Sequence, residues 1–245
     1  MTEPAASDSH QGLIDHLTEL RQRLIWSVMG LFVGFLACWG FSEALFDIIR
    51  RPISPYLSTE TGGLIFTAPM DKFLAHIKVS FLGSVVITCP FWIYQVWKFV
   101  APGLYKNEKK AALAFISLGS VLFITGVLFV YFVVFPLAFQ FLMGFGGDTD
   151  VPMITISDYL SFFILATLVF GLAFEMPLIL LILGTMGVVD AEMLASKRRY
   201  AIVLLAVLSA MVTPPDMISM FLMLLPMILL YEVSILLVRF TSPKD

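Results

Sequence analysis

Long runs without a charged residue constrain the fold of this chain more than any other feature. Between Lys110 and Asp148 lie 37 consecutive uncharged residues, and charge-free runs of 19 residues follow both Arg23 and Lys78. About 20 apolar helical residues cross a bilayer core of about 30 Å. Apolar residues make up 59% of the chain and charged residues only 13%, whereas soluble domains carry about 25% charged residues. We therefore expect an all-α integral membrane protein.

The charge-free runs predict one membrane domain over residues 1–245 with six transmembrane helices. The last two runs hold only 16 and 15 residues, so both final helices are expected to be short and to thin the bilayer around them. A Pro214-Pro215 hairpin joins them. The predicted spans cover approximately residues 24–42, 74–98, 110–140, 158–187, 199–213 and 217–237.

Prolines inside the runs predict bent helices. Pro136 divides the longest run, but residues 137–147 are too few to return across the membrane, so a single helix kinked at Pro136 is the better interpretation. Pro90, Pro177 and Pro226 fall inside other spans, where proline removes a backbone donor and bends the helix.

The basic residues predict the orientation. With six spans, eleven Lys and Arg residues lie on the side of the two termini and four on the other, so both termini are expected in the cytoplasm. Residues 1–23 form the cytoplasmic N-terminus, in which leucines at helical spacing over residues 13–24 predict a short amphipathic helix on the membrane surface. The net charge of −3 provides no basic field for nucleic acid.

Common catalytic and cofactor motifs are missing from the sequence. It contains no GxxxxGK[ST], HExxH or GxSxG pattern, and Cys38 and Cys89 form no CxxC pair. We therefore expect no metal site, no cofactor and no enzymatic activity.

Isolated acidic residues are the remaining candidates for function. Glu19 has Arg23 four residues further on, so it is either a solvated charge with a helical partner or a binding group. Glu108 stands among three lysines, so it either balances their charge locally or is a binding group.

Glu175 is different because it lies in the middle of a predicted span. A charged side chain at a helix centre costs roughly 2.5–3.5 kcal/mol on insertion scales, so such residues are functional by default. We expect a neutral or hydrated carboxyl; the alternative is a carboxyl that only packs against a neighbouring helix. Glu175 alone would also permit a secondary transporter for a small solute or ion. The unequal halves of the chain argue against the inverted repeats usual in transporters.

Six segments together resemble the TatC family, the polytopic core of the twin-arginine protein translocase. The resemblance extends from about residue 10 to residue 240 and includes FEMP around Glu175 and VTPPD ending at Asp216. The matching segments are residues 16–24, 94–108, 129–139, 174–177, 197–200 and 212–216.

The resemblance implies both an activity and partners. Proteins of this family bind the Arg-Arg signal peptides of folded precursors at the cytoplasmic face of a bacterial-type inner membrane. They have six helices and a concave face within the membrane, self-associate in a larger complex, and work with single-span TatA- and TatB-type proteins. Export is driven by the proton-motive force.

The resemblance also implies roles for individual residues. Glu19, Glu108 and Phe99 match the signal-peptide site, and Glu175 matches an intramembrane acid on the concave side that we expect to contact a partner helix. The further functional candidates are Arg21, Tyr131 and Asp216 in the matching segments, and Pro52, which lies outside them but matches a position associated with activity.

Overall fold

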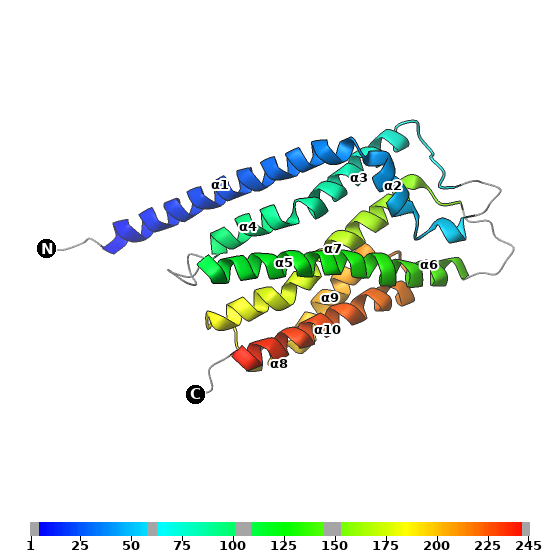
Figure 1. The fold of residues 1–245 in the computed structure, drawn as a ribbon. Helices are drawn as coiled ribbons and strands as arrows, with labels where there is room; N and C mark the ends of the chain where they lie inside the picture. The colour runs from blue at the N-terminus through cyan, green and yellow to red at the C-terminus, as the bar shows by residue number, and fades with distance from the viewer. Residues whose placement is uncertain (1–4, 58–62, 101–108, 145–152, 242–245) are drawn as a thin grey trace.

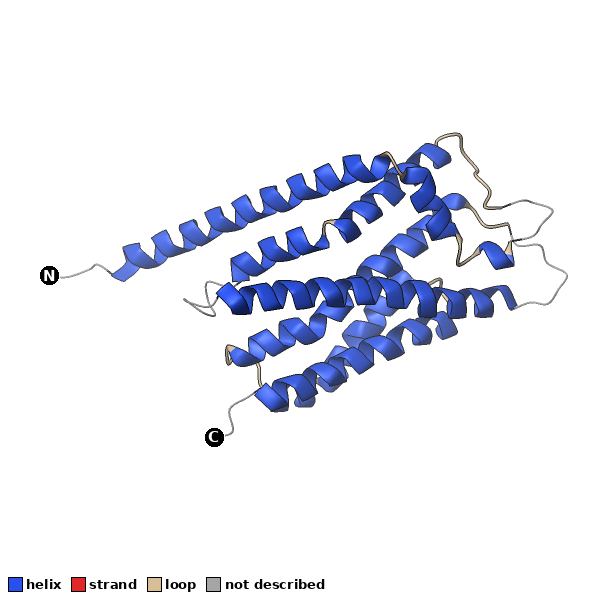
Figure 2. Cartoon of the chain, viewed as in Figure 1, coloured by secondary structure: helices blue, strands red, loops and turns tan. Residues whose placement is uncertain are grey.

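A computed structural model describes residues 5–57, 63–100, 109–144 and 153–241, which are helical apart from their connections and one isolated parallel bridge (Figures 1 and 2). The bridge joins Ile65 to Thr155 and so ties together two loops that are far apart in sequence. The elements are α1 Ala5–Trp39, α2 Ser42–Arg50, η1 Ser54–Tyr56, α3 Asp71–Ile87, α4 Cys89–Val100, α5 Lys109–Phe129, the π-helical turn η3 Val130–Val134, α6 Phe135–Gly144, α7 Ile156–Thr185, α8 Ala191–Ser196, α9 Arg198–Val212 and α10 Met217–Thr241.

The described helices confirm an all-α membrane architecture with four or five apolar spans. Four helical segments are long and apolar enough to cross a membrane by themselves: Leu17–Trp39, Leu113–Gly144, Ile156–Thr185 and Met217–Thr241. The bent pair α3 and α4 makes a fifth. The remaining candidate, α9, has 15 residues, which corresponds to roughly 22 Å and confirms the expectation of a short helix there.

The bend predicted at Pro90 is confirmed. Helices α3 and α4 meet at 59°, and the residue between them, Thr88, lies two residues before the proline. The indole N–H of Trp92 donates to the carbonyl of Val85 at 3.0 Å, and the hydroxyl of Thr88 donates to that of Ser84 at 2.8 Å. Side chains therefore satisfy backbone carbonyls at the bend, as the absence of water in a bilayer core requires.

The helix around Pro136 is also continuous, as predicted, but its distortion begins before the proline. The N–H of Phe135 donates to the carbonyl of Val130, five residues back, and residues 130–134 form a π turn. Pro136 has no N–H and therefore interrupts the regular series of α-helical backbone hydrogen bonds. The π turn, with its one extra residue, lies next to this interruption.

Two predictions about helix length were wrong. The last helix, α10, is not short: its 25 residues correspond to roughly 38 Å. The charge of Glu232 does not end the helix, because the carboxylate pairs with Arg198 at 2.7 and 2.9 Å. At the other end, residues 13–24 are not a separate surface helix but belong to the single 35-residue helix α1, since no proline interrupts it.

Helix α7 lies at the centre of the core. It packs against α5, α10 and α3, whereas α1 packs along α3 and α4 at the edge of the molecule (Figure 1). The start of α1, the end of α10, the end of α4 and the start of α5 lie at one end, which we call the terminal end (Figure 1). The opposite end, which carries α2 and the starts of α3 and α7, is called the α2 end (Figure 1).

Candidate functional site

The predicted signal-peptide residues belong to helices that meet at the terminal end. Glu19 and Arg21 lie on α1, and Phe99 lies near the end of α4, where it is partly buried. Glu108 lies outside the described residues, immediately before α5 begins at Lys109. The structure therefore brings the helices that carry Glu19 and Phe99 to the same end of the molecule.

Glu19 is engaged by its own helix. Its carboxylate accepts a hydrogen bond from Arg23 at 3.0 Å, with the side chains 34% and 20% exposed, respectively. The Nε of Arg23 is buried without a hydrogen-bond partner among the described residues. An external guanidinium can bind Glu19 only by sharing or replacing this contact. Arg21, two residues before Arg23, is exposed.

Glu175 lies in the interior where α4, α5 and α7 meet. The residue is only 6% exposed, and among the described residues its Oε1 has no hydrogen-bond partner. A β-carbon built on Gly119 of α5 would lie 3.2 Å from Oε2 of Glu175 and 3.4 Å from the side chain of Ile93 on α4. Because Gly119 has no side chain, the carboxyl group of Glu175 has room against α5. The prediction of an ionisable group inside the membrane domain thus corresponds to a buried carboxyl with an unused oxygen atom.

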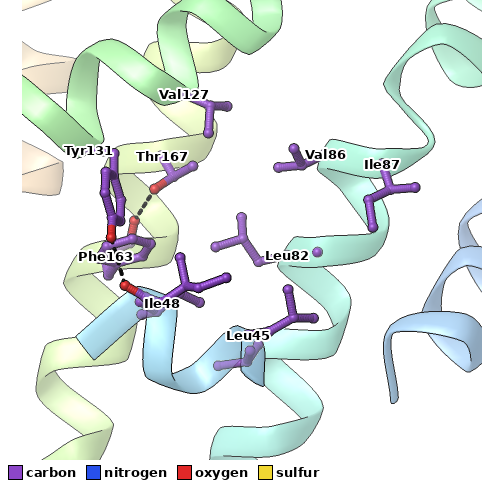
Figure 3. A pocket seen from close by; sticks show the side chains of 12 residues that line it. Leu45, Ile48, Leu82, Val86, Ile87, Val127, Tyr131, Phe163 and Thr167 are labelled. Atoms are coloured by element: carbon purple, nitrogen blue, oxygen red, sulfur yellow. Dashed lines mark hydrogen bonds between the residues drawn. The ribbon is translucent and has the colours of Figure 1, made fainter. Parts of the chain in front are cut away.

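Pro52 and Tyr131 are brought together at the α2 end. Both line a groove of about 620 Å³, together with Arg51 and Pro136. The hydroxyl of Tyr131, in the π turn, donates to the carbonyl of Ile48 at 2.9 Å, near the end of α2 (Figure 3). The same carbonyl also accepts from the N–H of Arg51 at 3.2 Å, so the tyrosine hydroxyl adds a second hydrogen bond at the end of α2.

A second tyrosine at this position could not be found from the sequence. The hydroxyl of Tyr159, on α7, donates to the carbonyl of Ile49, and the tyrosine is buried. Both tyrosines reach α2 across a large separation in sequence, and no local motif signals that contact. Figure 3 shows the neighbouring cavity of about 170 Å³, in which Ile48 and Tyr131 face Leu82 and Val86 of α3.

Asp216 begins α10. Its Oδ1 accepts from the N–H of Ser219 at 2.6 Å, so the residue caps the helix. Its Oδ2 and the hydroxyl of Ser219 are buried, and neither has a hydrogen-bond partner among the described residues. The turn at Pro214-Pro215 between α9 and α10 is present as predicted.

Arg198 and Glu232 form a contact that the sequence motifs did not reveal. The guanidinium donates twice to the carboxylate, at 2.7 and 2.9 Å, and joins the start of α9 to α10. The hydrogen bond to Glu232 raises the pKa of Arg198 above its ordinary value. Within the described residues, no group of three or more His, Cys, Asp or Glu side chains could hold a metal ion, and Cys38 and Cys89 are free thiols.

Comparisons with known proteins agree over nearly the whole chain. The profile of the family described as Sec-independent protein translocase protein (TatC) matches residues 15–226. Proteins of that name from Desulforapulum autotrophicum and Helicobacter pylori are 40% and 39% identical. The alignments cover 94% and 95% of this chain and 86% and 89% of those proteins, respectively.

The fold agrees with solved structures as well. A crystal structure described as Twin Arginine Translocase Receptor-TatC superposes with a TM-score of 0.83 at 38% identity, covering 91% of this chain and 97% of that one. A second structure of that receptor, in the detergent DDM, gives a TM-score of 0.84 at 38% identity, with 91% and 99% covered.

Proposed function

Because this chain belongs to the TatC family of Sec-independent protein translocase components, we propose that it is the core subunit of a twin-arginine translocase and binds Arg-Arg signal peptides of folded precursors. Membership makes it a multi-pass membrane protein of protein transport rather than an enzyme. The observation that carries the proposal is the likeness, at 38% identity over 91% of the chain, to a structure described as the twin-arginine translocase receptor.

The proposed topology has six crossings of the bacterial cytoplasmic membrane with both termini in the cytoplasm. The six crossing units are α1, the pair α3–α4, the continuous helix α5–α6, α7, α9 and α10. Eleven of the 15 Lys and Arg residues then lie on the cytoplasmic side, as the positive-inside rule requires. The terminal end is therefore the cytoplasmic face, and α9 is the one short crossing.

The signal-peptide site consists of Glu19, Glu108 and Phe99 at that face. A guanidinium presents a planar fork of donors that a carboxylate accepts in pairs, which a lysine ammonium cannot reproduce. Exposed ion pairs are worth about 0–1 kcal/mol, so the two arginines provide specificity, while apolar contacts, including Phe99, provide much of the affinity.

The Glu19–Arg23 contact gives this site a competitive character. A guanidinium of the signal peptide must share the Glu19 carboxylate with Arg23, which contacts it at 3.0 Å, or replace Arg23 there. Arg23→Gln therefore should strengthen binding of an Arg-Arg peptide about two- to fivefold, because a partly exposed ion pair worth up to about 1 kcal/mol no longer competes for Glu19.

The experiment is capture of an Arg-Arg signal peptide, and of its Lys-Lys variant, by the detergent-solubilised chain. Glu19→Ala and Glu108→Ala should each weaken capture of the Arg-Arg peptide, and the difference from the Lys-Lys peptide should shrink. Glu43→Ala is the matched control, since Glu43 is an exposed acid on α2 at the opposite end. Unchanged binding by both single mutants and by the double mutant would overturn the assignment.

Partner recruitment is assigned to the membrane interior. The unused Oε1 of Glu175 supports a contact with a polar side chain of a TatA- or TatB-type helix, because a neutral carboxyl both donates and accepts. Such partners, self-association in a larger complex and use of the proton-motive force complete the proposal. A solute transporter through Glu175 gains no support from the cavities described above, since Glu175 lines neither the groove of about 620 Å³ nor the cavity of about 170 Å³.

A further inference from the structure

A groove between α3 and α7 near the α2 end combines one cation with an apolar floor. The groove has a volume of about 260 Å³. Its residues are Lys78 and Ser161 on the polar side and Phe81, Ile164, Leu165 and Leu168 on the apolar side. Phe81 and Leu165 are 47% and 42% exposed, respectively, so the apolar side opens towards the surroundings of the helices.

Lys78 has unused hydrogen-bonding capacity. Its ammonium donates to the hydroxyl of Ser161 at 3.3 Å, and among the described residues it forms no ion pair. An ammonium carries three donors, so two remain for a ligand. The Ser161 hydroxyl donates to the carbonyl of Ser157 at 2.7 Å and therefore receives the lysine as an acceptor, which fixes the position of the ammonium group.

The polarity of the groove has a direction. Helices α3 and α7 both begin at the α2 end (Figure 1). Lys78 precedes Phe81 on α3, and Ser161 precedes Leu165 and Leu168 on α7, so the charged end of the groove lies towards the membrane surface. The apolar side continues for roughly 10 Å deeper along α7, by helical rise. A phospholipid has the same order, with its phosphate near the membrane surface and its acyl chains deeper.

An acid lies further out on the same side. Asp71, two turns before Lys78, lines a small notch with Lys78 and Ser157, so the notch and the groove share the lysine. The Oδ2 of Asp71 accepts from the N–H groups of Thr67 and Ala68, each at 2.8 Å, while its other oxygen has no hydrogen bond among the described residues. A cation placed deeper and an anion placed further out complement a headgroup whose phosphate is inside and whose ammonium is outside.

We propose that the α3–α7 groove binds a zwitterionic aminophospholipid, with its phosphate on Lys78, its primary ammonium towards Asp71, and one acyl chain along Phe81 and Leu165. The proposal does not depend on signal-peptide binding, because no residue of the groove belongs to that site. The lipid would hold α3 and α7 together at the α2 end.

Native mass spectrometry of the full chain in mild detergent tests the proposal. Phosphatidylethanolamine, phosphatidylglycerol and phosphatidylcholine with identical acyl chains are titrated separately. Lys78→Gln should weaken phosphatidylethanolamine binding about fivefold, which corresponds to the loss of one exposed ion pair of about 1 kcal/mol. Lys72→Gln is the matched control: Lys72 lies on the same helix, over the ring of Phe66 and outside the groove, and its loss should leave binding unchanged.

A second pair of variants tests the acyl chain. Leu165→Trp fills the groove and should weaken binding while Lys78 stays in place, whereas Leu172→Trp, also exposed on α7 but outside the groove, should not. Because these sites are exposed, the variants should fold, and thermal unfolding checks this.

Three outcomes would overturn the proposal. Equal losses for Lys78→Gln and Lys72→Gln would indicate a general surface charge effect. Unchanged phosphatidylethanolamine binding by Lys78→Gln would show that Lys78 only extends its ammonium to the membrane surface and binds no lipid phosphate. Tighter binding of phosphatidylglycerol than of phosphatidylethanolamine would refute the role of Asp71.

Discussion

Two helix contacts in this protein use glycine in different ways. Between α5 and α7, a β-carbon on Gly126 would lie 2.6 Å from the backbone oxygen of Phe170, and one on Gly171 would lie 2.6 Å from the buried ring of Phe123. Between α1 and α4, a β-carbon on Gly30 would lie 2.5 Å from the side chain of Phe91. The first contact is partly backbone against backbone; the second is backbone against an exposed side chain.

The difference separates a fixed core from an adaptable edge. Membrane helices associate through close packing at small residues, since lipid provides no hydrophobic driving force. A side chain such as Phe91 can rotate, whereas the backbone of α7 cannot move without displacing its neighbours. In the most apolar stretch of each helix, only 11% of the residues of α1 are buried, compared with 39% of the residues of α7. The helix that carries Glu19 is therefore the one with the freedom to adjust to a peptide.

The largest expected effect tests the core contact. Gly126→Val forces a side chain into the backbone of α7 and should destabilise the protein by about 3 kcal/mol, the upper range for overpacking. Gly30→Val should cost under about 1 kcal/mol, since Phe91 can give way. Thermal and denaturant unfolding in detergent measure both. Equal losses would remove the distinction between core and edge.

Glu175 tests whether the fixed core also carries function. Glu175→Ala should lower export of an Arg-Arg precursor up to about tenfold, because one hydrogen bond to a partner helix, worth up to about 1.5 kcal/mol, disappears. Glu175→Gln retains donor and acceptor and should be the mildest change, and Glu175→Lys should be worse than Gln. Signal-peptide capture should be unaffected in all three. Normal export and normal partner crosslinking by Glu175→Ala would show that the carboxyl only packs.

The contrast between core and edge was only partly predictable. Charge-free runs located the helices because hydrocarbon excludes charge, and Pro90 marked the bend because proline interrupts the backbone ladder. The same rule failed for α10, since a charge on a helix can be paired: Glu232 bonds to Arg198. A run without charge therefore gives a minimum helix length only.

The candidate site shows the same limit. Glu175 stood out from the sequence because any acid within a span is costly. The pairing of Glu19 with Arg23 followed from helical spacing and is present at 3.0 Å. The contacts from Tyr131 and Tyr159 to α2 could not be foreseen, because they depend on which helices become neighbours.

Those two tyrosines extend the comparison to the α2 end. Tyr159→Phe leaves the carbonyl of Ile49 without this donor in a buried position and should cost about 1 kcal/mol. Tyr131→Phe should cost less, because Tyr131 is only partly buried and water can replace its hydroxyl. Hydrogen exchange of α2 reports both effects. Faster exchange in Tyr131→Phe than in Tyr159→Phe would contradict the assignment.

The smallest effect concerns Asp71, which lies before the predicted span and outside the core. Hydrogen bonds from the N–H groups of Ala68 and Thr67 hold the pKa of its carboxyl below the ordinary value. Because the pKa of Asp71 is lowered in the folded state, its ionised carboxylate stabilises the loop at any pH above the ordinary pKa of about 3.9. This stabilisation is lost as the pH falls through the lowered pKa. Protection of residues 64–70 from hydrogen exchange, corrected for intrinsic rates, should therefore be the same at pH 7 and pH 5 and decline only below about pH 4. Asp71→Asn should show weaker protection at pH 7 and no decline, because the amide does not titrate in this range. A decline beginning above pH 5 in the unmodified chain would mean that another group controls the loop.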